Sequence, residues 1–165
     1  MASTLERQEI EQRLYEARMH IQLTWGYFAP LLYRIRFVVL DPVEAWQREV
    51  LTTTITPRLE LLMNADFVVS RTVPDLIVIL YHEMAHVWRM TWQRQANRDP
   101  LLWNLAMDLE INEHMWNEVL TTERVARVSR TVLEGLVTPV NFNIRPGRTA
   151  EAYYEDLTGC EWQTT

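Results

Sequence analysis

The sequence predicts an α+β fold, in which a single, mainly helical domain spans residues 1–165 and carries a small three-stranded sheet. Apolar residues recur at helical spacing near the N-terminus and in two long central segments. Two short segments with β-branched residues, and a third that partly alternates between apolar and polar residues, lie between these helical segments. A chain of 165 residues with 48% hydrophobic residues can bury one core, and only 4 glycines and 7 prolines leave little room for linkers.

The first predicted helix covers residues 4–22. Its apolar residues recur every three or four positions among charged ones, so one face should pack and the other should be solvated. Pro30 should break or kink the aromatic segment that follows. We predict three strands over residues 34–40, 51–56 and 58–63. Asp41-Pro42 should end the first strand, and a turn or short helix should follow the third.

The central helix is expected to begin at Thr72. This threonine can cap the helix, Pro74 falls in its first turn and Asp75 lies three residues after the cap. The helix should run to about residue 95, and a second helix should cover about 101–120. Two further elements are predicted near residues 125–133 and 150–157, with an extended loop over 139–147 between them.

The net charge of -6, with a pI near 5.2, argues against two classes of partner. An acidic chain without a basic cluster is expected to bind neither nucleic acid nor an anionic membrane. No apolar stretch has the length of a signal-peptide core or a membrane span, so we expect a cytoplasmic protein. The one cysteine, Cys160, cannot form an intramolecular disulfide and is assigned no ligand role.

The central helix carries the motif H-E-x-x-H from His82 to His86. Histidines four apart project from one helical face, so both imidazoles can reach one metal ion. Glu83 is then beside the metal, where it can accept a proton from water, as in zinc hydrolases. The alternative is a pair of surface histidines, but the flanking residues are apolar all round, and a buried imidazole needs a partner.

A catalytic zinc site requires a third protein ligand. Asp108 is our candidate, because it lies on a largely apolar face of the second helix, and Asn104 and Asn112 could orient it from four residues away. The alternative for Asp108 is a buried acid that the asparagines and backbone amides satisfy. Glu110 and His114 fall on a more polar face and are expected to form a pair at the surface.

The stretch W-N-x-A-x-D-x-x-I-N, from Trp103 to Asn112, follows the H-E-x-x-H and an R-D-P turn. In this it resembles the "putative metallopeptidase" domain that bacteria and phages often carry joined to a von Willebrand factor A-like domain. Further matching segments are Tyr27–Arg36, Asn64–Phe67 and Thr149–Tyr154, so the resemblance covers about residues 20–157. No von Willebrand factor A-like region follows, so a stand-alone version from a bacterium or phage is expected.

This resemblance implies a zincin-like core, in which a small sheet lies beside two antiparallel helices that hold the metal. It implies that His82, His86 and Asp108 bind one zinc ion and that Glu83 is the general base. The expected function is therefore hydrolysis of a peptide or protein substrate. Tyr153 or Tyr154 could stabilise the oxyanion, although packing in the core is the expected role of each.

Two other functions remain open. The first is a non-catalytic or latent zincin-like adaptor, which the resemblance would pair with a MoxR-type AAA+ ATPase or a von Willebrand factor A-domain protein. The second is a metal-free helical interaction domain, which the intact motif argues against.

Overall fold

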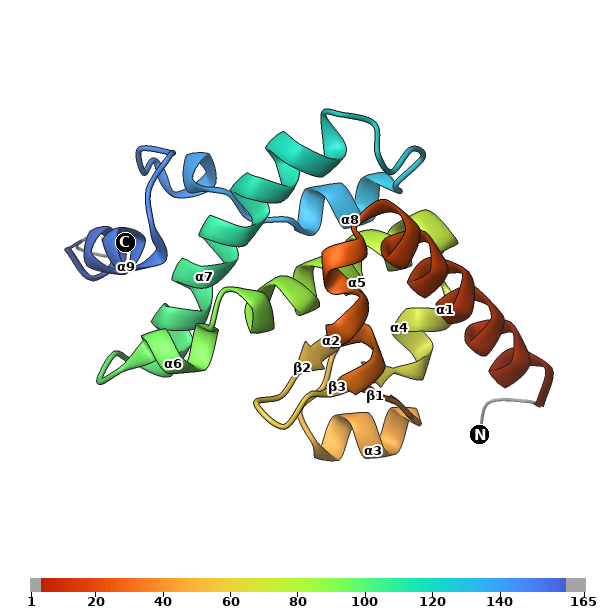
Figure 1. Ribbon diagram of the computed structural model, residues 1–165. Coiled ribbons are helices and arrows are strands. Elements are labelled where there is room, and N and C mark those ends of the chain that lie inside the picture. Colours follow the sequence, from red (N-terminus) through yellow and green to blue (C-terminus); the bar gives the residue numbers. More distant parts are fainter. Residues whose placement is uncertain (1–3, 160–165) are drawn as a thin grey trace.

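The computed structural model describes residues 4–159 and has the predicted mainly helical α+β fold (Figure 1). Two helices form its centre, α5 (Val73–Trp88) and α7 (Pro100–Met115). The sheet and α1 (Thr4–Thr24) pack against α5, whereas α9 (Ala150–Gly159) packs against α7. Cys160 lies outside the described residues.

The sheet consists of β1 (Arg36–Leu40), β2 (Thr53–Ile55) and β3 (Glu60–Asn64). The three predicted strands are confirmed, although each is shorter than predicted and β3 ends one residue later, at Asn64. Strand β3 is central, parallel to β1 and antiparallel to β2. Its middle residues Leu61, Leu62 and Met63 are buried, as expected of the strand that has a neighbour on each side. Strand β2 therefore forms an edge of the sheet, and this edge faces α5.

A short helix that the sequence analysis did not anticipate, α3 (Pro42–Gln47), connects β1 to β2. Asp41 caps it by accepting hydrogen bonds from the backbone amides of Val43 and Glu44, and Pro42 occupies its first turn. Asp41-Pro42 ends the strand as predicted, but the same two residues also start a helix.

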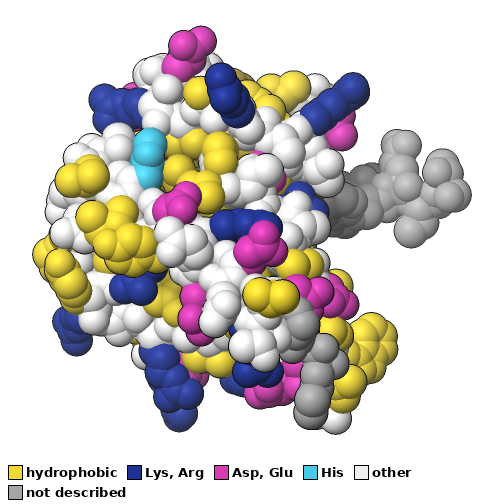
Figure 2. All heavy atoms as spheres, turned by 90° about the vertical axis from the view of Figure 1, so that its right-hand side faces the viewer, with side chains coloured by type: hydrophobic (Ala, Val, Ile, Leu, Met, Phe, Trp, Pro, Cys, Tyr) yellow, Lys and Arg dark blue, Asp and Glu magenta, His cyan; other side chains and the backbone are white. Residues whose placement is uncertain are grey.

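Helix α1 buries the predicted face, formed by Ile10, Leu14, Ala17 and Ile21. On the side of the molecule where α1 lies, acidic and basic side chains are interspersed among small apolar patches (Figure 2). Gly26–Phe28 form a 3-10 turn, and Pro30 lies in the first turn of α2 (Ala29–Arg34), so the predicted break occurs at the start of a new helix.

Helix α5 starts at the predicted cap. Thr72 and Asp75 form a reciprocal capping box, and Asp75 also accepts a hydrogen bond from the Ser129 amide at 2.7 Å. The helix ends at Trp88 instead of running to residue 95. Met90 has a φ of 57°, which breaks the helix before α6 (Thr91–Gln95). The predicted single helix of 74–95 is therefore wrong at its C-terminal end, and the chain turns back towards His86.

Helix α7 continues through a π-helical turn, Trp116–Leu120, so the second predicted helix is confirmed. It runs in the opposite direction to α5 (Figure 1). The chain then forms α8 (Arg130–Gly135), a 3-10 turn (Pro139–Phe142) and α9. That turn, which Thr138 and Asn141 cap, replaces the first part of the predicted extended loop. Within residues 4–159, no helix combines the length and the apolarity that crossing a membrane requires.

Candidate metal centre

Three potential ligand atoms converge between α5 and α7. His86 Nε2 lies 3.0 Å from Asp108 Oδ1, His82 Nε2 lies 3.3 Å from the same oxygen, and the two Nε2 atoms are 3.2 Å apart. The two histidines lie one turn apart on α5, and Asp108 reaches them from the facing helix α7. Two imidazoles and one carboxylate within 4.8 Å of one another form a group that could hold a metal ion. We call these three side chains, of His82, His86 and Asp108, the metal group.

The outer nitrogen of each imidazole is already engaged. The side-chain nitrogen of Asn112 donates to the Val137 carbonyl at 2.8 Å, which leaves the Asn112 oxygen facing His82. Since that oxygen can only accept, His82 Nδ1 is the donor to Asn112 Oδ1, also at 2.8 Å. His86 Nδ1 donates to Thr91 Oγ1 at 3.1 Å, while that hydroxyl donates to the His86 carbonyl at 2.8 Å. When each imidazole is neutral, its proton is therefore on Nδ1 and its Nε2 lone pair points into the group, as metal ligation requires.

Asp108 is held in the same way. Asn104 Nδ2 donates to Asp108 Oδ2 at 3.3 Å, whereas Oδ1, which faces the histidines, is buried and accepts no well-oriented hydrogen bond. A buried carboxylate oxygen without a donor is costly unless a cation satisfies it. Ligands at about 2.0–2.1 Å around one tetrahedral zinc ion lie about 3.3 Å apart, close to the spacing seen here. The residues present therefore fit a metal ion.

The pKa values of His82 and Asp108 also indicate that the metal group favours a bound positive charge. Burial lowers the pKa of His82, but the Asp108 carboxylate, whose Oδ1 lies 3.3 Å from His82 Nε2, outweighs this effect and raises the pKa to about 9. Burial raises the pKa of Asp108, but the adjacent imidazoles of His82 and His86 outweigh this effect and lower the pKa to about 2. The cluster thus attracts positive charge, either as a proton or as a metal cation.

Glu83 links the metal group to the edge strand of the sheet. Its side chain is buried, and both of its carboxylate oxygens accept hydrogen bonds from β2. The Thr53 hydroxyl donates to Oε1 at 2.8 Å and the Ile55 amide donates to Oε2 at 3.1 Å. Each oxygen still has a free lone pair, so Glu83 can accept a further proton or hydrogen bond from the cavity.

A cavity of about 540 Å³ contains the metal group and Glu83. Strand β2 contributes one wall, and α8 with the residues after it contributes another. Phe67 and Arg71, which precede α5, and Trp92, from α6, also line it. This volume is in the range of small-molecule binding sites.

The chain also matches a known family. Residues 9–164 match the family model described as "Putative metallopeptidase domain", a segment that contains the whole metal group and its cavity. The chain belongs to this family. No curated protein and no solved structure matches it.

Two expectations for α7 are wrong. Asn112 hydrogen-bonds His82 instead of Asp108, whose Oδ2 accepts its hydrogen bond from Asn104. Glu110 does not form an exposed pair with His114. Its side chain is only 11% exposed and accepts hydrogen bonds from Arg89, Arg94 and the Ala150 amide. Glu110 thereby joins the end of α5, α6 and the start of α9 to α7.

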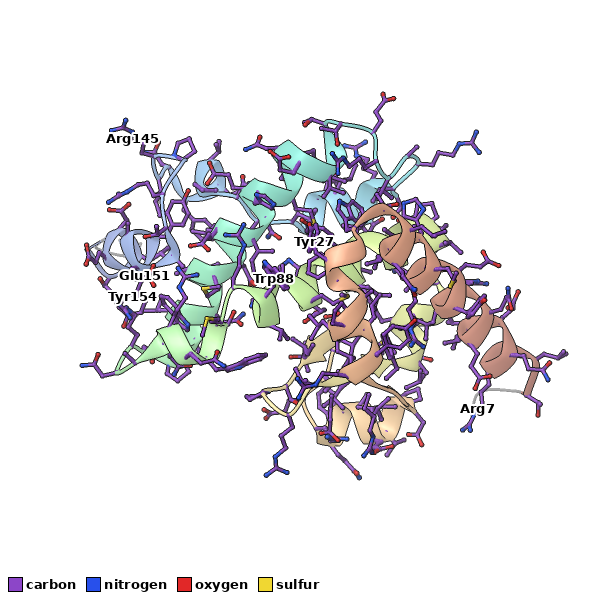
Figure 3. The ribbon with its side chains drawn as sticks, viewed as in Figure 1. Arg7, Tyr27, Trp88, Arg145, Glu151 and Tyr154 are labelled. Carbon is purple, nitrogen blue, oxygen red and sulfur yellow. The ribbon has the colours of Figure 1, made fainter. Side chains whose placement is uncertain are left out.

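The two tyrosines suggested for oxyanion stabilisation lie away from the metal group. The Tyr153 hydroxyl donates to Glu113, and the Tyr154 hydroxyl accepts from the Asp99 amide at 2.9 Å. Both residues belong to α9, on the side of α7 away from the sheet, where Figure 3 labels Tyr154. Neither lines the cavity, so both have the packing role that was expected of them.

Two residues that hold the site, Thr91 at His86 and Thr53 at Glu83, could not be identified from the sequence. Thr91 was assigned to the interior of a long helix, and only the left-handed conformation of Met90 turns it towards His86. Thr53 lies in a run of three threonines, whose β-branched side chains indicated a strand but no contact with the site. No local signal in the sequence identifies either contact.

Proposed function

We propose that this chain is a zinc-dependent metallopeptidase, in which His82, His86 and Asp108 bind one zinc ion and Glu83 is the general base. One observation carries the proposal. The three ligand atoms face one another while a hydrogen bond holds the far side of each residue, in a cavity that Glu83 also lines. Two imidazoles and one carboxylate are a donor set of catalytic zinc, which leaves a fourth position open.

Each residue then has a defined task. Zinc, when bound, would polarise the scissile carbonyl and lower the pKa of an attacking water. Glu83 takes a proton from that water on a free lone pair and returns it to the leaving amine. The hydrogen bonds from Thr53 and Ile55 keep its carboxylate in place during both transfers. Asn112 and Thr91 keep the imidazoles in the tautomer that binds metal.

Strand β2 offers a place for the substrate backbone. The backbone groups of Thr52 and Thr56 bond to β3, so by alternation those of Thr53 and Ile55 face away from β3. Ile55 donates its amide to Glu83, which is consistent with this direction. A peptide added along this edge would lie beside Glu83 and the metal group.

Metal content tests the first half of the proposal. Protein purified without chelator should contain about one zinc per chain, and His82→Ala and Asp108→Ala should lose it. His114→Ala is the matched control, because His114 is an exposed histidine on α7 that does not line the cavity. Equal zinc in all four proteins would refute the ligand assignment.

Hydrolysis tests the second half. Zinc-loaded protein should cleave members of a peptide library, detected by mass spectrometry, and Glu83→Gln should abolish cleavage while retaining zinc. Glu118→Gln, an exposed change in the π-helical turn after α7, is the control. An adaptor that works with a MoxR-type AAA+ ATPase or a von Willebrand factor A-domain protein would need the metal but not Glu83. If Glu83→Gln leaves every function of the protein intact, the catalytic proposal fails.

A further inference from the structure

The cavity that holds the metal group also contains one arginine. Arg71 directly precedes Thr72, the cap of α5, and lines the same cavity as His82 and Glu83. Of the described residues that line it, Arg71 is the one arginine, and the chain contains no lysine. Because a guanidinium is charged at any working pH, Arg71 supplies the cavity with a permanent positive charge.

This arginine has no acidic partner within residues 4–159. Its Nε donates to the Phe67 carbonyl at 3.4 Å, and its guanidinium carbon lies 4.7 Å from the centre of the Phe67 ring. No described carboxylate forms an ion pair with it, in contrast to Arg89 and Arg94, which both bind Glu110. Its two terminal nitrogens are therefore available as a fork that matches a carboxylate.

The position of Arg71 is held from two sides. Arg13, on α1, donates from Nη1 to the carbonyls of Val69 and Arg71 at 2.8 and 3.0 Å, which fixes the turn between α4 (Ala65–Val69) and α5. The stack on Phe67 restricts the guanidinium itself. A cation held in advance loses little entropy when it binds an anion, so its contribution to affinity is large.

We propose that Arg71 is a specificity-determining residue that binds a carboxylate of the substrate peptide. The inference rests on the peptidase function proposed above and names its substrate class. The carboxylate is either an Asp or Glu side chain or the α-carboxylate of the peptide C-terminus, since both offer the same two oxygens. The cavity's own carboxylates, Asp108 and Glu83, are engaged with the histidines and with β2, so neither neutralises Arg71.

The length of α5 limits how far this carboxylate lies from the scissile bond. From Thr72 to His82 the helix rises by about 15 Å, at about 1.5 Å per residue. An extended peptide advances about 3.3 Å per residue, so about five residues cover that distance. Arg71 should therefore select an acidic group within about five residues of the cleaved bond.

The test compares matched peptides on the zinc-loaded full chain. Internally quenched octapeptides carry a single Glu or Gln at successive positions, each with a free or an amidated C-terminus. At one position or at the free C-terminus, the acidic form should have a kcat/KM larger by on the order of ten- to hundredfold, as expected for charge-assisted hydrogen bonds. The amidated series separates a side-chain carboxylate from the C-terminal one.

Variants assign this preference to Arg71. Arg71→Gln should abolish it, and Arg71→Lys should retain part of it, because lysine keeps the charge without the fork. Arg18→Gln is the matched control, since Arg18 also stacks on a phenylalanine, 4.4 Å from the Phe37 ring, but does not line this cavity. Wild-type protein that cleaves acidic and neutral peptides equally would overturn the role of Arg71 and leave the peptidase function standing.

Binding of the same peptides, followed by fluorescence anisotropy, separates the two proposals if nothing is cleaved. Tighter binding of acidic peptides that is lost in Arg71→Gln would support the carboxylate site while refuting hydrolysis. Equal binding of acidic and neutral peptides, or no binding at all, would overturn the carboxylate site.

Discussion

Asn112 connects His82 to the opposite wall of the cavity. Its side-chain oxygen accepts the His82 Nδ1 proton at 2.8 Å, and its nitrogen donates to the Val137 carbonyl at 2.8 Å. Asn112 is 2% exposed and lies one turn after Asp108 on α7. The metal group is therefore complete only when α5, α7 and the segment after α8 are docked together.

Replacing Asn112 should weaken metal binding more than it disturbs the fold. Asn112→Ala frees the His82 ring to rotate and to change tautomer, which should lower zinc affinity about 10- to 100-fold. Competition with a chromophoric chelator measures this affinity. Asn117→Ala, an exposed change in the π-helical turn, should leave it unchanged. Unchanged zinc affinity in Asn112→Ala would contradict the orienting role.

Thr91 should support His86 in the same way. Thr91→Val preserves the shape of the side chain but removes the hydroxyl that accepts from Nδ1 and donates to the His86 carbonyl. We expect a loss of zinc affinity of about tenfold or more, measured by the same competition. Thr54→Val alters a cavity threonine without a side-chain contact to a histidine and should have no such effect. If both variants bind zinc equally, the hydroxyl has no role in ligation.

The stability of the metal-free protein should depend on pH through His82 and Asp108. The pKa of His82 is raised from 6.5 to about 9, so its contribution is complete below pH 6.5 and is lost as the pH rises through 9. The pKa of Asp108 is lowered from 3.8 to about 2, so its contribution is present above pH 3.8 and is lost as the pH falls through 2. Urea unfolding of chelator-treated protein should show both losses.

The proton that His82 binds below about pH 9 should compete with the metal ion. Because zinc must displace a proton from the cluster below about pH 9, zinc affinity should rise about tenfold per pH unit between neutrality and that value. Affinities measured at several pH values, with buffer binding corrected, test this directly. A flat profile between pH 7 and 9 would show that no proton occupies the cluster.

Glu110 should stabilise the fold. It is 11% exposed and binds two arginines and the Ala150 amide, which keeps its pKa below the ordinary value against the effect of burial. Glu110→Gln should lower the free energy of unfolding by about 1.5–3 kcal/mol. Glu134→Gln breaks an exposed pair with Arg130, so it should cost less than about 0.5 kcal/mol in the same urea titration. If the two variants lose comparable free energy of unfolding, the buried contacts of Glu110 do not stabilise the fold more than an exposed ion pair does.

Features encoded by neighbouring residues could be predicted from the sequence. The capping box at Thr72, the buried face of α1 and the three strands all follow from spacing and residue type within a few positions. The break after Trp88 could not be predicted, because residues 89–95 have no proline or glycine to signal it. The turn is stabilised by tertiary contacts, such as that of Arg94 with Glu110 and the hydrogen bond from Trp103 Nε1 to the Thr91 carbonyl.

The sequence by itself determined that His82 and His86 share one face of a capped, buried helix, with Glu83 between them. That follows from the period of the helix, which is a local property of the chain. The residue pattern of the second helix also favoured Asp108 over Glu110, but only the tertiary structure brings Asp108 against the two histidines. The tertiary structure also decided that Asn112, Thr91 and β2 hold the ligands and Glu83. These contacts depend on how α5, α7 and the sheet pack across long separations in the chain, and no local pattern encodes that packing.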